Sequence, residues 1–483
     1  MTSKTIMLSK SKYTSGLSCP RLLWMLVNAP EKIPPVDEAT QARFDVGHEV
    51  GALAKQLHPD GVEIERNADS LKTTQDLLKK RKPLFEATFA HKNAYCKADL
   101  LIPHGKDEWA LIEVKSSTEV KDEHLEDVAF QYYALTGAGI KLHKIFVMVL
   151  NNEYVFDGKL DLKQLLAMHD VTEDAITKSE EVEGNVENML EIVKGKCPKP
   201  KLGSECKEPK DCHVCAPDLE GIELAELYYF GKKAWPLINQ GITAFNNIPA
   251  DVKVGPKQQI QIDAVEKGKP HIEVKAIKNF LKAFKEPITC LDFETINPGI
   301  PLFIGTKPYQ QIPFQFSAHI IEKGKVKHVE VLADAKGDPR KEFLEGLKQL
   351  PKEGSYLAFN SSFEKRILHD LAEAFPKEAK WITQIIDRMD DLATPFREFW
   401  YYHPNQHGSY SIKSVLPSMT GKGYEGMDIA EGGAAIRAFT TLLKDGLSAK
   451  EVKKIRDDLL KYCGRDTEGM VEVLKALREA IDG

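Results

Sequence analysis

The stretch ITCLDFETI, residues 288–296, places two acidic side chains inside an otherwise apolar run. Side chains alternate along a β-strand, so Asp292 and Glu294 share one face while Leu291, Phe293 and Thr295 occupy the other. Two carboxylates on one face repel each other and are costly to bury. A divalent cation between them is the simplest way to offset that cost, although an exposed strand face with two solvated acids explains this stretch alone equally well.

Length and composition bound the class of protein. The chain has 483 residues, of which 42% are hydrophobic and 29% charged, and this balance is typical of a soluble globular protein with two or three domains. The net charge of −6 argues against coating of nucleic acid by the whole surface but leaves room for a local basic groove. No run of 18 apolar residues and no apolar signal region at the start are present, so we expect a cytoplasmic protein without membrane contact.

The C-terminal part, residues 286–483, is predicted to be an α/β domain. Its order begins with the strand at 288–296, continues with strands in FQFSAHIIE and VKHVEVLA, and then gives a helix in RKEFLEGLKQL. A further strand in GSYLAFN precedes a helix in FEKRILHDLAEAF and helical C-terminal segments. This alternation is typical of one sheet with covering helices.

Three further residues extend the acidic pair in this domain. The stretch NSSFEKRIL sets Glu364 at the start of a helix, and YCGRDTEG sets Tyr462 and Asp466 four residues apart, on one helix face. Together with Asp292 and Glu294, they give four carboxylates and a tyrosine that can converge at one sheet edge. Such a set suits two Mg²⁺ or Mn²⁺ ions that clamp the attacking and leaving oxygens of a phosphodiester, with the tyrosine hydroxyl positioning the water.

This ordered set resembles the DEDD exonuclease superfamily of the RNase H-like fold, in the subgroup whose last motif is Tyr-x3-Asp. The matching positions are Asp292, Glu294, Asn360, Phe363, Glu364, Tyr462 and Asp466. One departure is that Glu364 stands where the family has aspartate, which lengthens the ligand arm. The resemblance implies metal-dependent 3′–5′ exonuclease activity, with Asp292, Glu294, Glu364 and Asp466 as metal ligands and Tyr462 as a catalytic residue.

Other polar residues of this domain are given structural roles. Asp391, in DRMDDLATPF, is interpreted as a turn or helix-cap residue rather than an extra metal ligand. His403 and His407 lie in a loop without a third ligand, so they are not interpreted as a zinc pair.

The N-terminal part, residues 1–218, is predicted to hold a second α/β core. A helix in FDVGHEVGALAKQLHP is followed by a hairpin of ADLLIP and WALIEVK, a helix in HLEDVAFQYYAL and a strand in KIFVMVLN. In the hairpin, Glu113 and Lys115 share a face, and the partner strand can bring Asp99 beside Glu113. Two carboxylates can hold Mg²⁺ while the lysine orients water, and Gln131 lies on a helix that can lean over them.

This arrangement resembles the PD-(D/E)xK nuclease superfamily, in particular the RecB-like branch that includes the CRISPR-adaptation nucleases. Asp99, Glu113 and Lys115 match its core motif, and Gln131 matches the family's helical glutamine. The resemblance implies that Asp99 and Glu113 bind metal and that Lys115 and Gln131 act in catalysis. The chain departs from the branch in its first helix, where the position four residues after Gly47 is glycine instead of histidine; His48 and Glu49 are the nearby alternatives.

A cysteine cluster accompanies this part of the chain. Four of the eight cysteines fall within residues 197–215, and such a cluster in a cytosolic protein indicates a metal or iron–sulfur centre. The RecB-like resemblance implies one cysteine before the nuclease core and three after it, and the matching residues are Cys19, Cys206, Cys212 and Cys215. Four thiolates fit a [4Fe–4S] cluster, with tetrahedral zinc as the rival and Cys197 as a competing ligand.

The lysine-rich run around these cysteines is a predicted phosphate contact. Residues 194–210 hold six lysines against two acids. Residues 219–285 are predicted to be a small, mainly helical connecting module that ends in a hairpin over QQIQIDAVEKGKPHIEV.

We therefore expect an α/β protein with a PD-(D/E)xK restriction-endonuclease-like core and an RNase H-like domain. The chain resembles an uncharacterised bacterial family that joins these parts, and the resemblance implies a metal-dependent nuclease acting on nucleic acid, DNA more than RNA, in DNA repair or defence. Two alternatives stay open: a nucleic-acid-binding scaffold with one or both sites inactive, and an RNA-processing exonuclease. The sequence leaves protein partners and oligomeric state open.

Overall fold

The computed structural model describes residues 6–206, 212, 214–215, 219 and 221–482. By their contacts these residues divide into two compact units. The first comprises the described residues of Met1–Lys201, Glu205–Asp218 and Pro298–Gln310, and the second comprises those of Leu202–Ser204, Leu219–Asn297 and Gln311–Gly483. The predicted connecting module therefore lies within the second unit, and the short segment Pro298–Gln310 lies within the first.

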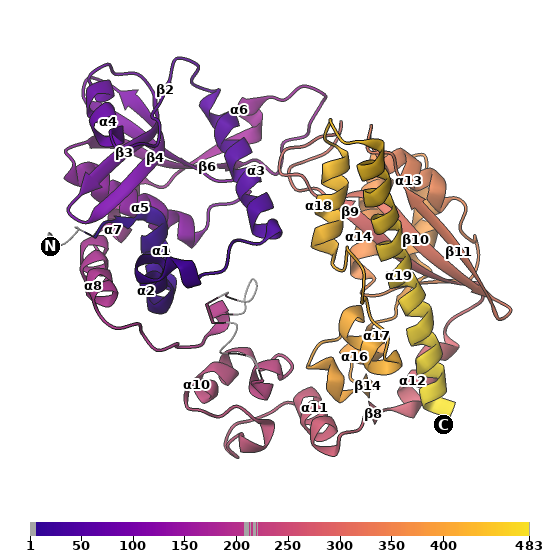
Figure 1. The fold of residues 1–483 in the computed structure, drawn as a ribbon. Helices are drawn as coiled ribbons and strands as arrows, with labels where there is room; N and C mark the ends of the chain where they lie inside the picture. Colours follow the sequence, from indigo (N-terminus) through magenta and orange to yellow (C-terminus); the bar gives the residue numbers. More distant parts are fainter. Residues whose placement is uncertain (1–5, 207–211, 213, 216–218, 220, 483) are drawn as a thin grey trace. The chain divides into compact units, whose positions relative to one another are not determined.

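A mixed sheet forms the centre of the first unit (Figure 1). In the described residues its order is β2-β3-β4-β5-β6-β7, with β1 parallel to β4. Strands β3, β4 and β5 form an antiparallel meander, and β6 lies parallel to β5. The bounds are β1 Leu8–Ser9, β2 Val62–Glu63, β3 Leu84–His91, β4 Ala94–His104, β5 Glu108–Val114, β6 Lys141–Leu150 and β7 Leu166–Asp170.

Helices cover both faces of this sheet. Buried residues of α1, α5, α7 and α8 share one apolar cluster with the strands, and α3 covers the opposite face through Val50 and Ala54. Figure 1 shows α5 and α7 side by side under the sheet. The bounds are α1 Lys10–Ser18, α2 Pro20–Asn28, η1 Pro30–Lys32, α3 Glu38–Lys55, α4 Ser70–Leu78, α5 Asp122–Gly137, α6 Leu162–Leu165, α7 Thr172–Ser179, α8 Val182–Lys194 and η2 Ser204–Cys206.

The second unit is built on a five-stranded sheet of order β11-β10-β9-β12-β13 in its described residues. The first three strands in the chain pair antiparallel, whereas β12 and β13 are parallel to β9, which is therefore central. The bounds are β9 Ile288–Ile296, β10 Ile312–Glu322, β11 Lys325–Leu332, β12 Ser355–Ala358 and β13 Met389–Asp391. Strands β9, β10, β11 and β12 were predicted and are confirmed, whereas β13 was not predicted.

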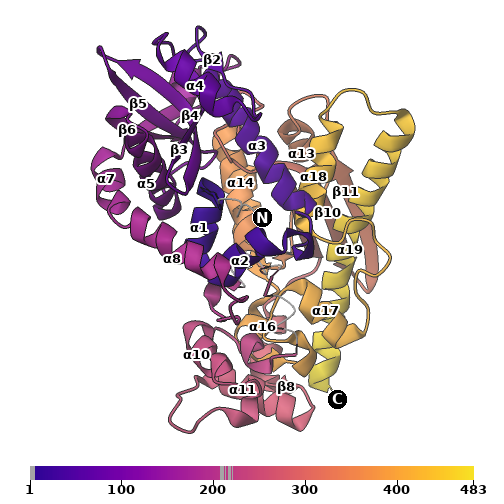
Figure 2. The same cartoon turned by 60° about the vertical axis from the view of Figure 1, so that its left-hand side comes forward.

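Two helical layers bury this sheet. On one face, Leu291 and Phe293 of β9 pack with α13, α14 and α15, and on the other, Ile288 and Cys290 pack with α12, α16, α17 and α19. Figure 2 shows α17 beside the long α19. The bounds are α12 Val274–Lys282, α13 Arg340–Leu347, α14 Ser362–Ala374, α15 Ala379–Ile386, α16 Thr394–Arg397, η6 Pro404–Gln406, α17 Ile412–Thr420, α18 Gly432–Leu442 and α19 Ala449–Asp482.

The hairpin predicted at 258–274 is wrong. The segment forms α11, Pro256–Lys267, followed by the short β8, His271–Ile272, which pairs with β14, Tyr401–Tyr402. The alternation of Gln and Ile is typical of a half-exposed strand, but Gln261 is buried. Its side-chain amide forms hydrogen bonds with the backbone of Tyr228 and Glu226, which makes this burial possible. Pro256 at the first helical position and Gly268 in the left-handed conformation delimit the helix.

The rest of the connecting module is helical, as predicted. Its elements are η3 Glu223–Glu226, η4 Gly231–Lys233, α10 Ala234–Asn239 and η5 Phe245–Asn247. Both units thus combine sheets with covering helices, which confirms the predicted mixed α/β class. Across the described residues, no helix has the length and apolar character needed to span a membrane.

The turn before β12 gives a test of this packing. Gly354 has φ +83°, and a Cβ there would lie 2.0 Å from the Pro287 carbonyl oxygen, whereas Gly446, with φ +95°, has open space around it. We expect Gly446→Ala to lower the free energy of unfolding by about 1 kcal/mol through backbone strain alone. Gly354→Ala adds a clash with fixed backbone and is expected to cost about 3 kcal/mol. Equal costs in urea denaturation would contradict the close approach of this turn to Pro287.

Candidate metal-binding active sites

The acidic site of the second unit lies on the face of β9 that α19 covers. The register places Asp292 beside Ser317 and Glu294 beside Gln315 of β10, so both acids face the same side. One carboxylate oxygen from each of Asp292, Glu294 and Asp466 lies within 4.8 Å of the others. These three residues come from two segments that are far apart in the chain, and the fold brings them together as the sequence predicted.

Glu364 approaches the same group from the first turn of α14. Its side chain is buried, and its Oε2 has no hydrogen-bond partner among the described residues. The negative charge of Glu364 raises the pKa of both Asp292 and Glu294, so the three acids are electrostatic neighbours. A buried carboxylate oxygen without a partner is costly, and a cation is the partner that such an oxygen lacks.

Burial is the main reason that these acids favour protons. It raises the pKa of Asp292 and Glu294 well above their ordinary values, with Asp466 as the next cause for each. Burial raises the pKa of Glu364 to about 8 and that of Asp466 to about 6. Four carboxylates held this close together fit a divalent cation. Its positive charge would offset their repulsion, and its binding would displace their protons.

Two tyrosines surround Asp466. Tyr424 donates a hydrogen bond to Asp466 Oδ1, and the Tyr462 hydroxyl also stabilises the charged Asp466 by hydrogen bonding. Burial, followed by the charge of Asp466, raises the pKa of both hydroxyls, so each remains a phenol that donates a proton in a hydrogen bond. The predicted position of Tyr462, one helical turn before Asp466, is confirmed, and its chemistry is that of a donor rather than a base.

Lys413 of α17 supplies positive charge to this site. Its ammonium lies 5.8 Å from the Tyr424 ring centre and 5.4 Å from that of Tyr462, and its charge lowers the pKa of Glu294 and Asp466. Sequence reasoning missed Lys413 and Tyr424 because neither stands in the quoted motifs, and only packing against α19 brings them to the acids.

The other polar residues of this domain have contacts of their own. Asp391 accepts hydrogen bonds from the backbone of Asn360 and Ala393 and pairs with Arg397 at 2.6 Å, so it shapes a turn. His407 Nδ1 lies 2.9 Å from Glu226 Oε2, and His403 Nδ1 accepts from the Asn405 backbone. These histidines therefore have separate loop contacts.

The site of the first unit lies across β4 and β5. The register that pairs Leu100 with Ile112 brings Asp99 opposite Glu113, as predicted. Gln131 of α5 donates to Glu113 Oε2 at 2.5 Å, and Lys115 Nζ lies 2.9 Å from Glu113 Oε1. The four predicted residues of this unit are therefore gathered at one place.

Lysines balance the charge of Glu113. Lys10 of α1 forms an ion pair with Glu113, and Lys115 also pairs with Asp127. Burial alone raises the pKa of Glu113, but the ammonium groups of Lys10 and Lys115 outweigh it and hold that pKa well below its ordinary range. Burial and the charge of Glu113 raise the pKa of Asp99 to about 7. Sequence reasoning missed Lys10 because it lies 103 residues from Glu113.

A pocket of about 600 Å³ opens over this site. His48 and Gly51 of α3 line it together with Asp99, Glu113 and Lys115, whereas Glu49 does not line it. Of the two alternatives in this helix, His48 is the one at the pocket. A Cβ on Gly51 would meet no atom within 4 Å, so this position leaves space in the pocket.

Glu86 is a third acid at this pocket that sequence reasoning missed. The β3–β4 register, in which Phe85 pairs with Leu100 and Ala87 with Ala98, sets Glu86 opposite Asp99. Glu86 has a positive φ of 56°, an uncommon conformation for a residue other than glycine. Its charge contributes to raising the pKa of Asp99.

The four predicted ligand cysteines lie together in the first unit. Burial, followed by the neighbouring thiols of Cys206, Cys212 and Cys19, raises the pKa of Cys215 to about 12. The Cys212 N–H donates to the Cys206 carbonyl at 2.7 Å, and the Cys215 N–H donates to the Cys212 carbonyl at 3.0 Å. The thiol of Cys19 accepts from Leu22 at the start of α2. Several converging thiols fit a metal centre that displaces their protons.

Cys197 is exposed, and its thiol contacts the adjacent Pro198 carbonyl. Of the lysines in the predicted basic run, Lys207 and Lys210 lie outside the described residues.

Comparison with known proteins finds a described family that part of the chain matches, but it assigns no activity. Residues 289–411 match a family described as "Domain of unknown function (DUF2779)", a range that includes Asp292, Glu294 and Glu364. "Uncharacterized protein MG366" of Mycoplasma genitalium is 24% identical over 225 residues, 42% of this chain and 34% of that protein. "Uncharacterized protein UU173" of Ureaplasma parvum is 26% identical over 215 residues, 40% and 31% respectively. The matches thus span about a third of the length of these relatives.

The pKa shifts predict opposite pH trends for metal-free and metal-bound protein. The folded pKa of Asp466, about 6, exceeds its ordinary value of 3.8, so the folded state holds this proton more tightly than the unfolded state does. The contribution of this proton to folding stability is complete below pH 4 and is lost as pH rises through 6. We expect metal-free protein to lose up to about 3 kcal/mol of stability on this account by pH 8, and Asp466→Asn to reduce the loss. Mn²⁺ should bind more tightly at pH 8 than at pH 5, since binding releases protons. Calorimetric Mn²⁺ affinity independent of pH would contradict this electrostatic description.

Proposed function

We propose that the chain is a metal-dependent nuclease whose second unit holds the principal active site. The observation that carries the proposal is the convergence of Asp292, Glu294 and Asp466, with oxygens within 4.8 Å of one another on a buried strand face. Glu364 adds a fourth carboxylate with a partnerless buried oxygen. Hard oxygen ligands of this kind select Mg²⁺ or Mn²⁺.

Within this site each residue has a definite task. Asp292, Glu294, Glu364 and Asp466 would hold the ions, which supply Lewis-acid stabilisation of charge on a phosphodiester and a water of lowered pKa. The Tyr462 phenol, kept protonated by burial and by Asp466, donates a hydrogen bond that can orient the attacking water. Lys413 offers a positive charge to the phosphate beside the acids.

The topology supports an RNase H-like fold for this unit. In chain order, three strands pair antiparallel and two follow parallel on the other side of the first, and the acids lie on that first strand. Together with the motif resemblance, this favours 3′–5′ exonuclease action. The polymer we propose is DNA, with RNA as the alternative.

The first unit supports a PD-(D/E)xK nuclease core. The unit has an antiparallel meander followed by α5 and a parallel strand. Asp99 and Glu113 lie on the meander, Lys115 directly follows β5, and Gln131 lies on the helix. We propose that Asp99 and Glu113 bind a metal ion here and that Lys115 orients water, since its ammonium already contacts Glu113.

One observation favours a binding role instead for this first site. Lys10 and Lys115 already neutralise Glu113, so a cation is needed less here than beside Asp292. A site with balanced charge can hold a nucleic-acid backbone without cutting it, which is the scaffold alternative for this unit alone.

We propose a [4Fe–4S] cluster on Cys19, Cys206, Cys212 and Cys215, with zinc as the alternative. The effect of the Cys206, Cys212 and Cys19 thiols on the pKa of Cys215 supports a four-thiolate centre. Such a centre would join the segment that contains α1 and α2 to the segment after α8, and strands β2 to β7 lie between these two segments in the chain. Its binding energy would then add to the stability of the first unit.

Nuclease assays on labelled single- and double-stranded DNA and RNA test the proposal. With Mg²⁺ or Mn²⁺ we expect 3′ trimming that Asp292→Asn lowers by on the order of a hundredfold or more, because charge stabilisation is lost. Glu364→Gln should lower it as well, while Glu373→Gln, an exposed acid on the same helix, should not. Lys115→Ala should remove a separate activity of the first unit. If Asp292→Asn and Lys115→Ala both cut like the wild type, the chain is no nuclease.

The cysteine centre has its own test. Protein purified without oxygen should be brown, with about four iron atoms per chain for a [4Fe–4S] cluster. Cys215→Ser should lose the iron and the visible absorbance and destabilise the first unit. Cys197→Ser should keep the iron and the absorbance, because the Cys197 thiol is exposed and, among the described residues, hydrogen-bonds only the adjacent carbonyl. A colourless wild-type protein that contains zinc would replace the cluster by a zinc site.

A further inference from the structure

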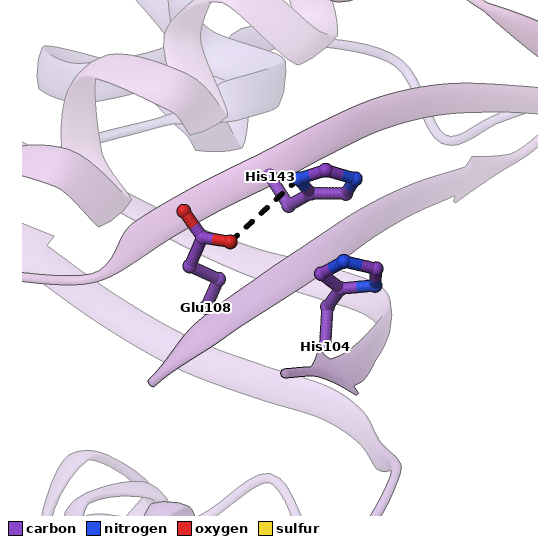
Figure 3. A group of neighbouring side chains, drawn as sticks. All are labelled: His104, Glu108 and His143. Carbon is purple, nitrogen blue, oxygen red and sulfur yellow. Dashed lines mark ion pairs between the residues drawn. The ribbon is translucent and has the colours of Figure 1, made fainter. Parts of the chain in front are cut away.

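Two histidines and a glutamate meet at the end of the first sheet that lies opposite Asp99 and Glu113 (Figure 3). His104 ends β4, Glu108 begins β5, and His143 lies in β6. One ligand atom from each lies within 4.8 Å of the others. The two imidazole rings stack with centres 3.7 Å apart, and His143 Nδ1 lies 3.6 Å from Glu108 Oε2.

The backbone explains why these three side chains share one face. His104 and Glu108 are directly paired across the β4–β5 turn, so their side chains project to the same side. The β5–β6 register is irregular between Trp109 and Ala110, where β6 advances from Leu142 to Lys144, so His143 is an extra residue there. Such irregularities redirect a side chain, and here it points to the other two.

Arg81 fixes the turn that carries two of these residues. Its guanidinium donates to the carbonyls of His104, Gly105 and Glu108, at 2.9, 3.2 and 2.8 Å, and it lies over the Trp109 ring. Because Arg81 bonds the backbone, the side chains of His104 and Glu108 stay available. The neighbouring charges Asp107 and Lys141 form an ion pair with each other.

We propose that His104, Glu108 and His143 bind a divalent transition-metal ion of the zinc type. Two imidazoles and one carboxylate are ligands that Zn²⁺ accepts, and water would complete its coordination. Imidazole ligands make Mg²⁺ an unsuitable occupant. The site is separate from the pocket over Glu113, because Glu108 and Glu113 are five positions apart along β5, a distance of about 17 Å.

The proposed ion stabilises the first unit. It ties the β4–β5 turn to β6 at the end of the sheet opposite Asp99 and Glu113, and ligation in the folded state alone raises stability by mass action. Its role does not depend on nuclease activity, so the site stands or fails independently of the proposed function.

Calorimetric titration with Zn²⁺ tests the site in the full chain. The cysteine centre is first loaded, and excess Mg²⁺ is present to occupy the carboxylates around Asp292. We expect wild-type protein to bind one more Zn²⁺ ion than the double variant that carries His104→Asn and His143→Asn. We expect Glu108→Gln to weaken Zn²⁺ binding at this site at least tenfold. His169→Asn, an exposed histidine on β7, is the matched control and should bind like the wild type.

A second measurement guards against misfolded variants. In EDTA the variants and the wild type should unfold at the same temperature, and Zn²⁺ should raise that temperature in the wild type and in His169→Asn only. Equal Zn²⁺ uptake by the wild type and the double variant, or an equal rise in unfolding temperature, overturns the proposal. A variant that already unfolds earlier in EDTA would show that the cluster stabilises the sheet without metal, which also overturns it.

Discussion

The repulsion between buried carboxylates on β9 is the constraint on which the second unit depends. Asp292 and Glu294 must face α19, because Leu291 and Phe293 fill the opposite core. Asp466 and Glu364 bring two more acids to the same place, and burial raises the pKa of every one of them. The folded chain gains no stability from gathering acids in this way, and a bound cation would offset their repulsion.

The first unit resolves a similar problem differently. Glu113 is buried as well, yet Lys10 and Lys115 pair with it, and its pKa falls instead of rising. Asp99, without such a partner, carries the raised pKa. The two sites therefore differ in how much positive charge they would need from a metal ion. The acids of the second unit have too little positive charge around them to balance their own, whereas the charges of the first site nearly balance.

The elements themselves were largely predictable, because the periodicity of apolar residues reflects local burial. The alternation in 288–296 and the spacing of Tyr462 and Asp466 both correspond to the strand and helix observed. The failure at 258–274 has a non-local cause. Gln261 occupies a buried position through hydrogen bonds to backbone that lies some thirty residues away, and a pattern that counts glutamine as polar and exposed assigns the wrong period.

By itself, the sequence determined which residue types were available and on which face of each element they lie, since strand and helix periods are properties of the local backbone. Thus Asp292, Glu294, Tyr462, Asp466, Asp99 and Glu113 were all identifiable as candidates. Only the tertiary structure decided which side chains lie next to one another: Lys10 beside Glu113, Lys413 beside Asp466, and His143 beside His104. The physical reason is that charge interactions act through space over a few ångströms, and the chain folds residues from distant segments to within that range.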